Sequence, residues 1–241
     1  MIAPAPTPAD GPRRPAAGLR SLECPPFPLA ASGATRAMNT TLQRVIVLSL
    51  LVLLMAATRT HYFTHFTPVP DASWAVFFIG GFYLRGWSRW AFPLLMVLAV
   101  GIDWAVITGQ GMDFWSHYCV SPGYWLLVPA HLAMWLGGLW LRRGYRGASL
   151  AALGKLALAV VASTALCHLF AQGGFYWTSD SVADPTVAGW AKNYADWFPP
   201  YLRATAMFVA LAAIAQVVCE QVVRHARPLA QEAKARDRDL R

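Results

Sequence analysis

Six apolar stretches follow one another along this chain, each close to the length that crosses a bilayer. They cover residues 42–57, 72–84, 91–108, 124–141, 150–171 and 201–223. About 20 apolar residues span the ~30 Å hydrocarbon core, so the first two stretches are short and we expect flanking residues or neighbouring helices to shield them. Because 56% of residues are hydrophobic and only 13% charged, the pattern predicts an all-α polytopic protein with six transmembrane helices, embedded in a lipid bilayer.

Lysine and arginine are distributed unevenly between alternate loops. One set of loops and both flanks carry Arg36, Arg44, Arg85, Arg89, Arg142, Arg143, Arg146, Arg224 and Arg227. The other set carries Asp71, Asp113, Asp180, Asp184 and Asp196, with Arg59, Lys192 and Arg203 as its basic residues. The positive-inside rule therefore predicts cytoplasmic N- and C-termini. The net charge of +8 reflects this topology and gives little support to a nucleic-acid partner.

The two ends of the chain differ from its centre. Residues 1–37 are crowded with proline and have no sustained apolar run, which is typical of a disordered tail. Met38-Asn-Thr-Thr leads naturally into the first apolar stretch, so Met38 is an alternative start and residues 1–37 are then not part of the protein. We predict a transmembrane substrate-binding domain over 38–227 and a solvated cytoplasmic tail over 228–241.

Several catalytic motifs are absent from the sequence. It contains no Gly-x-x-x-x-Gly-Lys-Ser/Thr phosphate loop, no His-Glu-x-x-His and no Gly-x-Ser-x-Gly. We therefore expect no ATP site in this chain, and if the protein is a transporter, ATP bound to this chain does not drive it. Its energy would come from a partner ATPase module, an ion gradient or trapping of the ligand inside the cell.

Cys119 is the most informative of the four cysteines. Cys24 lies in the N-terminal tail, and Cys167 and Cys219 lie within apolar stretches, where packing explains them. Cys119 lies in the polar, aromatic outer loop His-Tyr-Cys-Val-Ser-Pro-Gly-Tyr at 117–124. A soft, solvent-reachable sulfur there suggests a metal-centred ligand, and a merely tolerated thiol is the alternative.

Other ligand-capable groups are expected near the same outer rim. They are His61, His65, Asp103, His117, Tyr124 and Arg203. Asp103 lies in an apolar stretch, where an ionisable group usually faces a cavity or a partner. Arg203 could reach an anionic or amide-rich ligand or anchor the helix at lipid headgroups. Residues 172–200, rich in Trp, Tyr and Asp, are expected to form a long loop of the kind that acts as a lid.

The region from Met38 to about Arg227 resembles the BtuM-type cobalamin transporters, solitary relatives of the S components of energy-coupling factor transporters. The resemblance rests on the six spans, on Thr-Arg-Thr-His-Tyr-Phe at 58–63, on Pro-Asp-Ala-Ser-Trp-Ala-Val-Phe-Phe at 70–78, and on Cys119 followed five residues later by Tyr124.

The resemblance implies cobalamin uptake across the inner membrane of a Gram-negative bacterium. Cys119 would be an axial ligand to cobalt, and Tyr124 would help to fix the corrin. Thiolate donation could also assist decyanation of cyanocobalamin. The first span has no Ala-x-x-x-Ala for close contact with a coupling subunit, so dependence on an ATPase module stays open and the protein could act alone.

Three alternatives stay open at this stage. An S component for another vitamin or metal chelate would make Cys119 incidental. A membrane haem or redox protein would use His131 and His168, inside the fourth and fifth stretches, as iron ligands. A purely structural membrane protein would show no ligand affinity.

Overall fold

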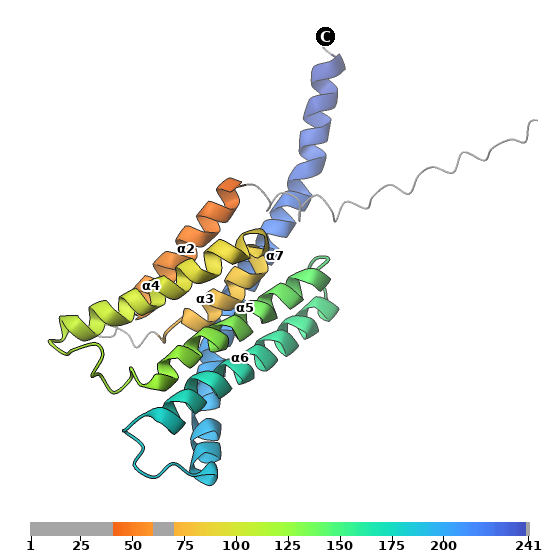
Figure 1. Ribbon diagram of the computed structural model, residues 1–241. Coiled ribbons are helices and arrows are strands. Elements are labelled where there is room, and N and C mark those ends of the chain that lie inside the picture. The colour runs from red at the N-terminus through yellow and green to blue at the C-terminus, as the bar shows by residue number, and fades with distance from the viewer. Residues whose placement is uncertain (1–40, 60–69, 240–241) are drawn as a thin grey trace, which may run out of the picture.

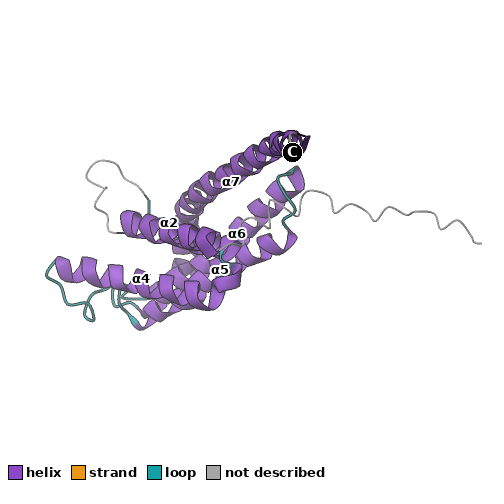
Figure 2. Cartoon of the chain, turned by 90° about the horizontal axis from the view of Figure 1, so that it is seen from above, coloured by secondary structure: helices purple, strands orange, loops and turns teal. Residues whose placement is uncertain are grey.

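The computed structural model describes residues 41–59 and 70–239, and these residues form helices and connecting loops without strands (Figures 1 and 2). The α-helices are α2 (Thr41–Arg59), α3 (Ser73–Tyr83), α4 (Ser88–Gly109), α5 (Leu127–Gly144), α6 (Leu150–Thr178) and α7 (Val187–Asp239). Short 3-10 helices, η1 (Arg85–Trp87) and η2 (Pro122–Leu126), lead into α4 and α5. Five helical segments are long and apolar enough to cross a membrane. The prediction of an all-helical polytopic membrane protein is confirmed.

The short apolar helix α3 lies at the centre of the bundle. Its 11 residues extend for only about 16 Å at 1.5 Å per residue, which is less than the hydrocarbon core. Every residue from Ser73 to Phe82 is buried, and α3 contacts α2, α4, α5, α6 and α7. The neighbouring helices therefore shield it, which explains how such a short apolar segment is accommodated.

Glycines allow α3 and α5 to approach closely. A Cβ atom at Gly81 would collide with the carbonyl oxygen of Trp135, and one at Gly138 would collide with the carbonyl oxygen of Phe78. Small residues at helix contacts permit this backbone approach in membrane proteins, where dispersion contacts drive much of the helix association. The pair fixes the distance between the central helix and one wall of the site described below.

The surrounding helices present apolar side chains outward. Leu50 on α2, Val97 on α4, Leu153 on α6 and Leu211 on α7 are each at least 58% exposed. Such faces would be unfavourable in water, but in a bilayer they contact lipid.

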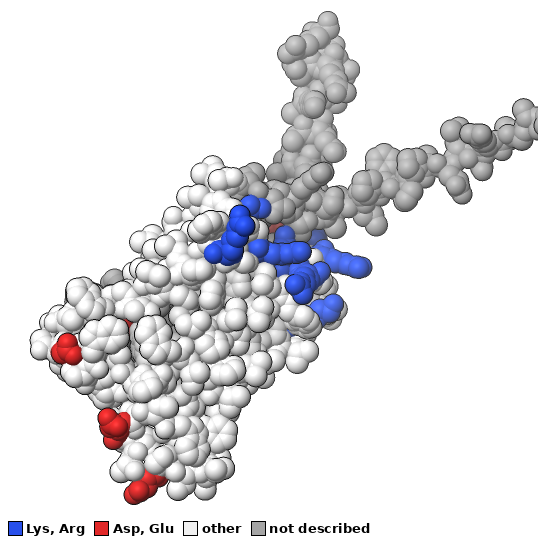
Figure 3. All heavy atoms as spheres, in the orientation of Figure 1, with Lys and Arg blue, Asp and Glu red and all other residues white. Residues whose placement is uncertain are grey.

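On the face shown in Figure 3, the Lys and Arg side chains gather at one end of the bundle and the most exposed Asp and Glu side chains lie toward the other. The end that we call the basic end contains the α3–α4 and α5–α6 connections, with Arg85, Arg89, Arg142, Arg143 and Arg146. The other, which we call the acidic end, contains the 110–121 and 179–186 connections, with Asp113, Asp180 and Asp184. The separation agrees with the alternation of charged loops in the sequence.

The prediction of a long loop over 172–200 is wrong. Helix α6 continues to Thr178 and α7 begins at Val187, so that only 179–186 connects them. The aromatic residues that suggested a loop have helical spacing: Trp190, Tyr194 and Phe198 contact one another in turn along α7. An i, i+4 aromatic series with these contacts stabilises a helix.

The structure tests the predicted C-terminal end of the transmembrane domain but not its predicted N-terminal end. The N-terminal tail over 1–37 and the alternative start at Met38 lie outside the described residues. The tail predicted from 228 begins within α7, whose helical backbone continues to Asp239. The helix that contains the last apolar stretch thus continues without a break to Asp239.

Candidate functional site

A cavity of about 710 Å³ lies at the acidic end of the bundle. Its rim includes His117, Tyr118 and Cys119 from the 110–121 loop, and Trp197 from α7. Its wall contains groups from every α-helix of the described bundle. Among them are Arg59, Trp74, Asp103, Tyr124, His131, His168, Gln172 and Tyr201.

The structure brings together four of the seven predicted site residues. Asp103, His117, Cys119 and Tyr124 all line this cavity, although they come from α4, a loop and η2. His61 and His65 lie outside the described residues.

Arg203 does not line the cavity. It is exposed on α7, whereas Tyr201 on the same helix lines the cavity. Two residues along an α-helix rotate a side chain by about 200°, so Arg203 lies on the opposite face. Its position suits the headgroup-anchor interpretation better than direct ligand contact.

The Cys119 thiol is exposed at the rim, on a loop held by polar contacts. The Cys119 backbone N–H donates to His117 Nδ1 at 3.3 Å, and Ser179 Oγ donates to the Tyr118 carbonyl at 3.3 Å. Partial desolvation by the surrounding protein raises the pKa of the Cys119 thiol, a hydrogen bond with Tyr118 acts in the opposite direction, and the Asp103 carboxylate raises it further. The free protein therefore holds mostly thiol at neutral pH, and a metal that displaces the thiol proton would form the thiolate.

The raised pKa predicts slow alkylation of Cys119 in the unliganded protein. At pH 7.5, iodoacetamide should modify Cys119 more slowly than a cysteine in an unstructured peptide, whose pKa is about 8.5. The rate should rise with pH and reach half its maximum above that value, as measured by mass spectrometry of the peptide that contains Cys119. Tyr118→Phe removes the opposing hydrogen bond and should move the midpoint higher. A rate that is already maximal at pH 8 contradicts this interpretation.

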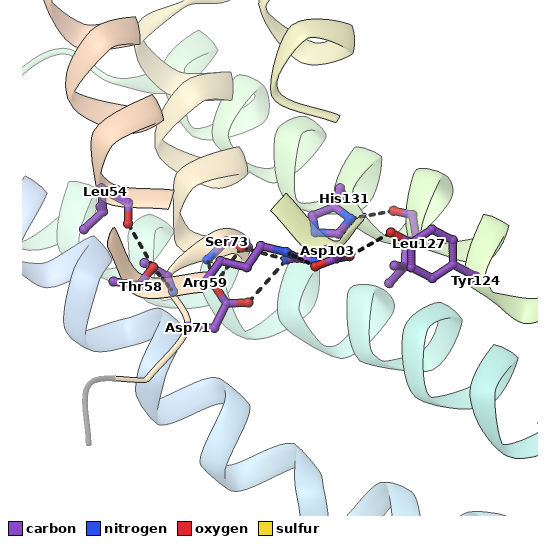
Figure 4. Close-up of polar contacts among 10 residues, drawn as sticks. Leu54, Thr58, Arg59, Asp71, Ser73, Asp103, Tyr124, Leu127 and His131 are labelled. Carbon is purple, nitrogen blue, oxygen red and sulfur yellow. Dashed lines mark hydrogen bonds and ion pairs between the residues drawn. The ribbon is translucent and has the colours of Figure 1, made fainter. Parts of the chain in front are cut away.

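Arg59 connects four elements around the cavity (Figure 4). At the end of α2, it binds Asp103 of α4 through two contacts, Nε to Oδ1 at 2.6 Å and Nη2 to Oδ2 at 2.7 Å. Tyr124 of η2 donates its hydroxyl to Asp103 Oδ2 at 2.7 Å. At the start of α3, Asp71 Oδ2 lies 3.4 Å from Arg59 Nη1, and Nη1 also donates to Ser73 Oγ at 2.9 Å.

This network explains why Asp103 is tolerated in an apolar helix. The Arg59 and Asp103 side chains are only 14% and 19% exposed, and an ion pair with hydrogen-bonded partners offsets the cost of burying the carboxylate. Arg59 was counted only as a loop charge in the sequence, so its role was missed. The clue was the unpaired acidic residue in the third stretch, but the sequence did not indicate which cation would reach it.

Helix η2 holds Tyr124 in place because its backbone at Gly123 packs directly against α6. The Gly123 backbone N–H donates to Thr178 Oγ1 at 2.8 Å, and Thr178 Oγ1 donates to the Gly174 carbonyl at 2.8 Å. Ser121 Oγ lies 3.0 Å from the same hydroxyl. A Cβ atom at Gly123 would collide with the Gly174 backbone.

Gly123→Ala should therefore destabilise the protein and displace Tyr124 from Asp103. Overpacking of this kind costs about 1–3 kcal/mol, which an unfolding titration in mixed micelles would measure. Gly101→Ala on α4 is the matched control, because a Cβ atom there meets no neighbouring atom; it should be neutral or stabilising by up to ~1 kcal/mol. Equal stability of the two variants would contradict the tight docking of η2.

His131 and His168 line the same cavity as Cys119. Both are 1% exposed, and each has one ring nitrogen without a hydrogen-bond partner in the described structure. Among the described residues, no three histidine, cysteine or carboxylate side chains gather to hold a bare metal ion. A metal that arrives inside a chelate needs fewer protein ligands, and the exposed sulfur of Cys119 suits that case.

Comparison with known proteins does not assign the chain to a family. No protein-family model matches the chain, and no curated protein matches it.

Proposed function

We propose that this protein binds cobalamin in the cavity at the acidic end and carries it across the bacterial inner membrane, with Cys119 as a ligand to cobalt. The observation that supports this most is the exposed sulfur of Cys119 at the rim of a cavity of about 710 Å³. Cobalt already held by a corrin has only its axial positions free, so one soft thiolate is sufficient to bind it. Coordination itself promotes loss of the thiol proton.

The size and surroundings of the cavity are compatible with a large, flat ligand. Small-molecule sites usually measure about 300–1,000 Å³, and a corrinoid exceeds a drug-sized ligand, so part of it would remain outside. Tyr118 and Trp197, which are 63% and 55% exposed at the rim, offer aromatic surface to that part. By the positive-inside rule the acidic end faces outward, where the ligand arrives.

Thiolate binding also provides a route to decyanation. Electron donation from sulfur to Co(III) weakens the bond to a cyanide on the opposite face. Cyanide then leaves with its electron pair and takes a proton to form HCN, water occupies the vacated position, and cobalt keeps its oxidation state. Cyanide release that is equal with wild type, with Cys119→Ala and without protein would exclude this accessory activity.

Retention of corrinoid by purified protein tests the proposed function. Detergent-solubilised wild type is incubated with aquocobalamin or cyanocobalamin and desalted, and we expect about one corrinoid per chain with a shifted visible spectrum. Proteoliposomes with the acidic end outward should accumulate labelled cobalamin. If no corrinoid is retained, the S component for another vitamin becomes the better proposal, and a panel of vitamins and metal chelates would identify its ligand.

The same accumulation experiment in proteoliposomes also identifies the energy source of uptake. The chain has no phosphate-binding loop, so accumulation by this protein alone would indicate a solitary carrier or trapping inside the vesicle. Accumulation only after addition of an energy-coupling ATPase module and ATP would indicate a partner-dependent S component.

A further inference from the structure

Two buried imidazoles in the cavity wall each have a hydrogen-bond partner at only one of their two ring nitrogens. His131 Nδ1 on α5 lies 2.6 Å from the Leu127 carbonyl oxygen, and His168 Nε2 on α6 lies 3.2 Å from the Tyr194 carbonyl oxygen. A carbonyl oxygen only accepts, so these two nitrogens carry hydrogen. His131 Nε2 and His168 Nδ1 are buried without a partner in the described structure. In a neutral imidazole such a nitrogen can only accept a hydrogen bond.

The rings are held in these orientations by packing. The His131 ring centroid lies 4.3 Å from that of Phe77. The His168 ring lies 4.6 Å from Tyr194, 5.3 Å from Tyr201 and 5.9 Å from Trp74. A ring fixed by a backbone hydrogen bond and aromatic contacts offers its acceptor at a set position.

Gln172 adds a donor and a further acceptor. It follows His168 by four residues on α6 and lines the same cavity. Both its Oε1 and its Nε2 atoms are buried without a partner in the described structure. Buried polar groups are normally paired, so unpaired atoms around one cavity point to a bound molecule or water that completes them.

We infer that His131, His168 and Gln172 form an amide-recognising wall that binds primary carboxamides at the edge of the ligand. A carboxamide N–H₂ group can donate to the two imidazoles, and a carboxamide also pairs with Gln172 by donating to Oε1 and accepting from Nε2. A metal held by the two imidazoles would leave Gln172 unpaired, so carboxamides explain all three side chains. This inference rests on the proposed function, because corrinoids carry several primary carboxamides around the ring.

Two corrinoid probes separate this wall from the cobalt ligand. Cobinamide carries the primary carboxamides, whereas the heptamethyl ester of cobyrinic acid has the same corrin and cobalt but esters without N–H. Dissociation constants of the full-length protein for the aquo form of each are measured by visible titration in detergent. We expect wild type to bind cobinamide at least tenfold more tightly than the ester, with a thiolate-shifted spectrum for both.

Three single substitutions test the individual side chains. His131→Phe, His168→Phe and Gln172→Leu should each weaken cobinamide binding by about five- to tenfold, as expected for the loss of one or two buried hydrogen bonds. The ester affinity should change by less than twofold, which also shows that the variants fold. His225→Phe is the matched histidine control, because its Nδ1 makes the same i−4 carbonyl contact at 2.8 Å on an exposed part of α7. Gln221→Leu, also exposed on α7, is the glutamine control.

Four results would overturn the inference. Equal wild-type affinity for the two probes would show that carboxamides are not recognised, whatever the variants do. Equal weakening of both probes in the variants would assign the three residues to the structure of the cavity. A haem absorption band in the purified protein that disappears in His131→Phe or His168→Phe would assign the imidazoles to iron. Failure of wild type to bind either corrinoid would reject the proposed function, and the inference with it.

Discussion

Replacing Arg59 with methionine is expected to lower the free energy of unfolding by about 3–5 kcal/mol, the cost of removing one partner from a buried ion pair. The substitution leaves the Asp103 carboxylate, which is 19% exposed, without its two contacts of 2.6 and 2.7 Å. It also leaves Asp71 without its cation at the start of α3. Unfolding titrations in mixed dodecylmaltoside and SDS micelles would measure the change.

Two further variants distinguish loss of this network from a general effect of charge removal. Lys192→Met removes a cation from an ion pair whose side chains are 78% and 54% exposed, and exposed pairs contribute at most about 1 kcal/mol. Arg59→Met combined with Asp103→Leu removes the buried carboxylate as well and should recover part of the lost stability. If Arg59→Met and Lys192→Met cost the same, the Arg59 network does not hold the bundle together.

Cys119→Ala is expected to weaken cobalamin binding at least about a hundredfold, which corresponds to about 2.7 kcal/mol. The reason is the loss of the only bond that the protein is proposed to make to cobalt. The visible spectrum of any remaining complex should return to that of the free ligand. Stability should hardly change, because Cys119 is exposed.

The matched control is Cys219→Ala. Cys219 is also an exposed cysteine, but it lies on α7 and does not line the cavity. Cys219→Ala should leave both the affinity for cobalamin and the visible spectrum of the complex unchanged. If Cys119→Ala bound cobalamin with unchanged affinity, the cavity would still be the binding site, but the sulfur would play no part in recognition.

The helical architecture could be predicted from the sequence because the length of an apolar stretch and the charge of a loop are local properties. Each can be compared with bilayer thickness or with the positive-inside rule without knowledge of the rest of the fold. Residues 91–108 and 150–171 correspond to α4 and α6, although each helix extends beyond the predicted bounds. Two neighbouring signals, Cys119 and Tyr124, were expected at one outer rim, and in the structure both line the same cavity. This grouping could be predicted because the two residues are close together in the sequence.

Features that depend on contacts between distant segments could not be predicted in this way. Arg59 and Asp103 are 44 residues apart, and no local pattern pairs them. Helix α7 already begins at Val187, and it packs against a distant segment through Tyr201, whose ring stacks on Trp74 of α3 with centroids 4.6 Å apart. Helix α7 continues through Pro199 and Pro200, so tertiary packing was stronger than local propensity there.

The two buried histidines of the cavity wall show a second limit of prediction from the sequence. From the sequence, His131 and His168 were considered only as iron ligands of a membrane haem or redox protein. Each does bind a backbone carbonyl, and each also lines the cavity that contains Cys119. Spacing along the chain could not place two different helices around one ligand site.

X-ray absorption at the cobalt K edge of the cobalamin-loaded protein tests the central claim most directly, because it identifies the atoms bound to cobalt. The account predicts one sulfur ligand in wild type and in Cys219→Ala, and none in Cys119→Ala. A cobalt coordinated only by nitrogen and oxygen in the wild-type complex would contradict it.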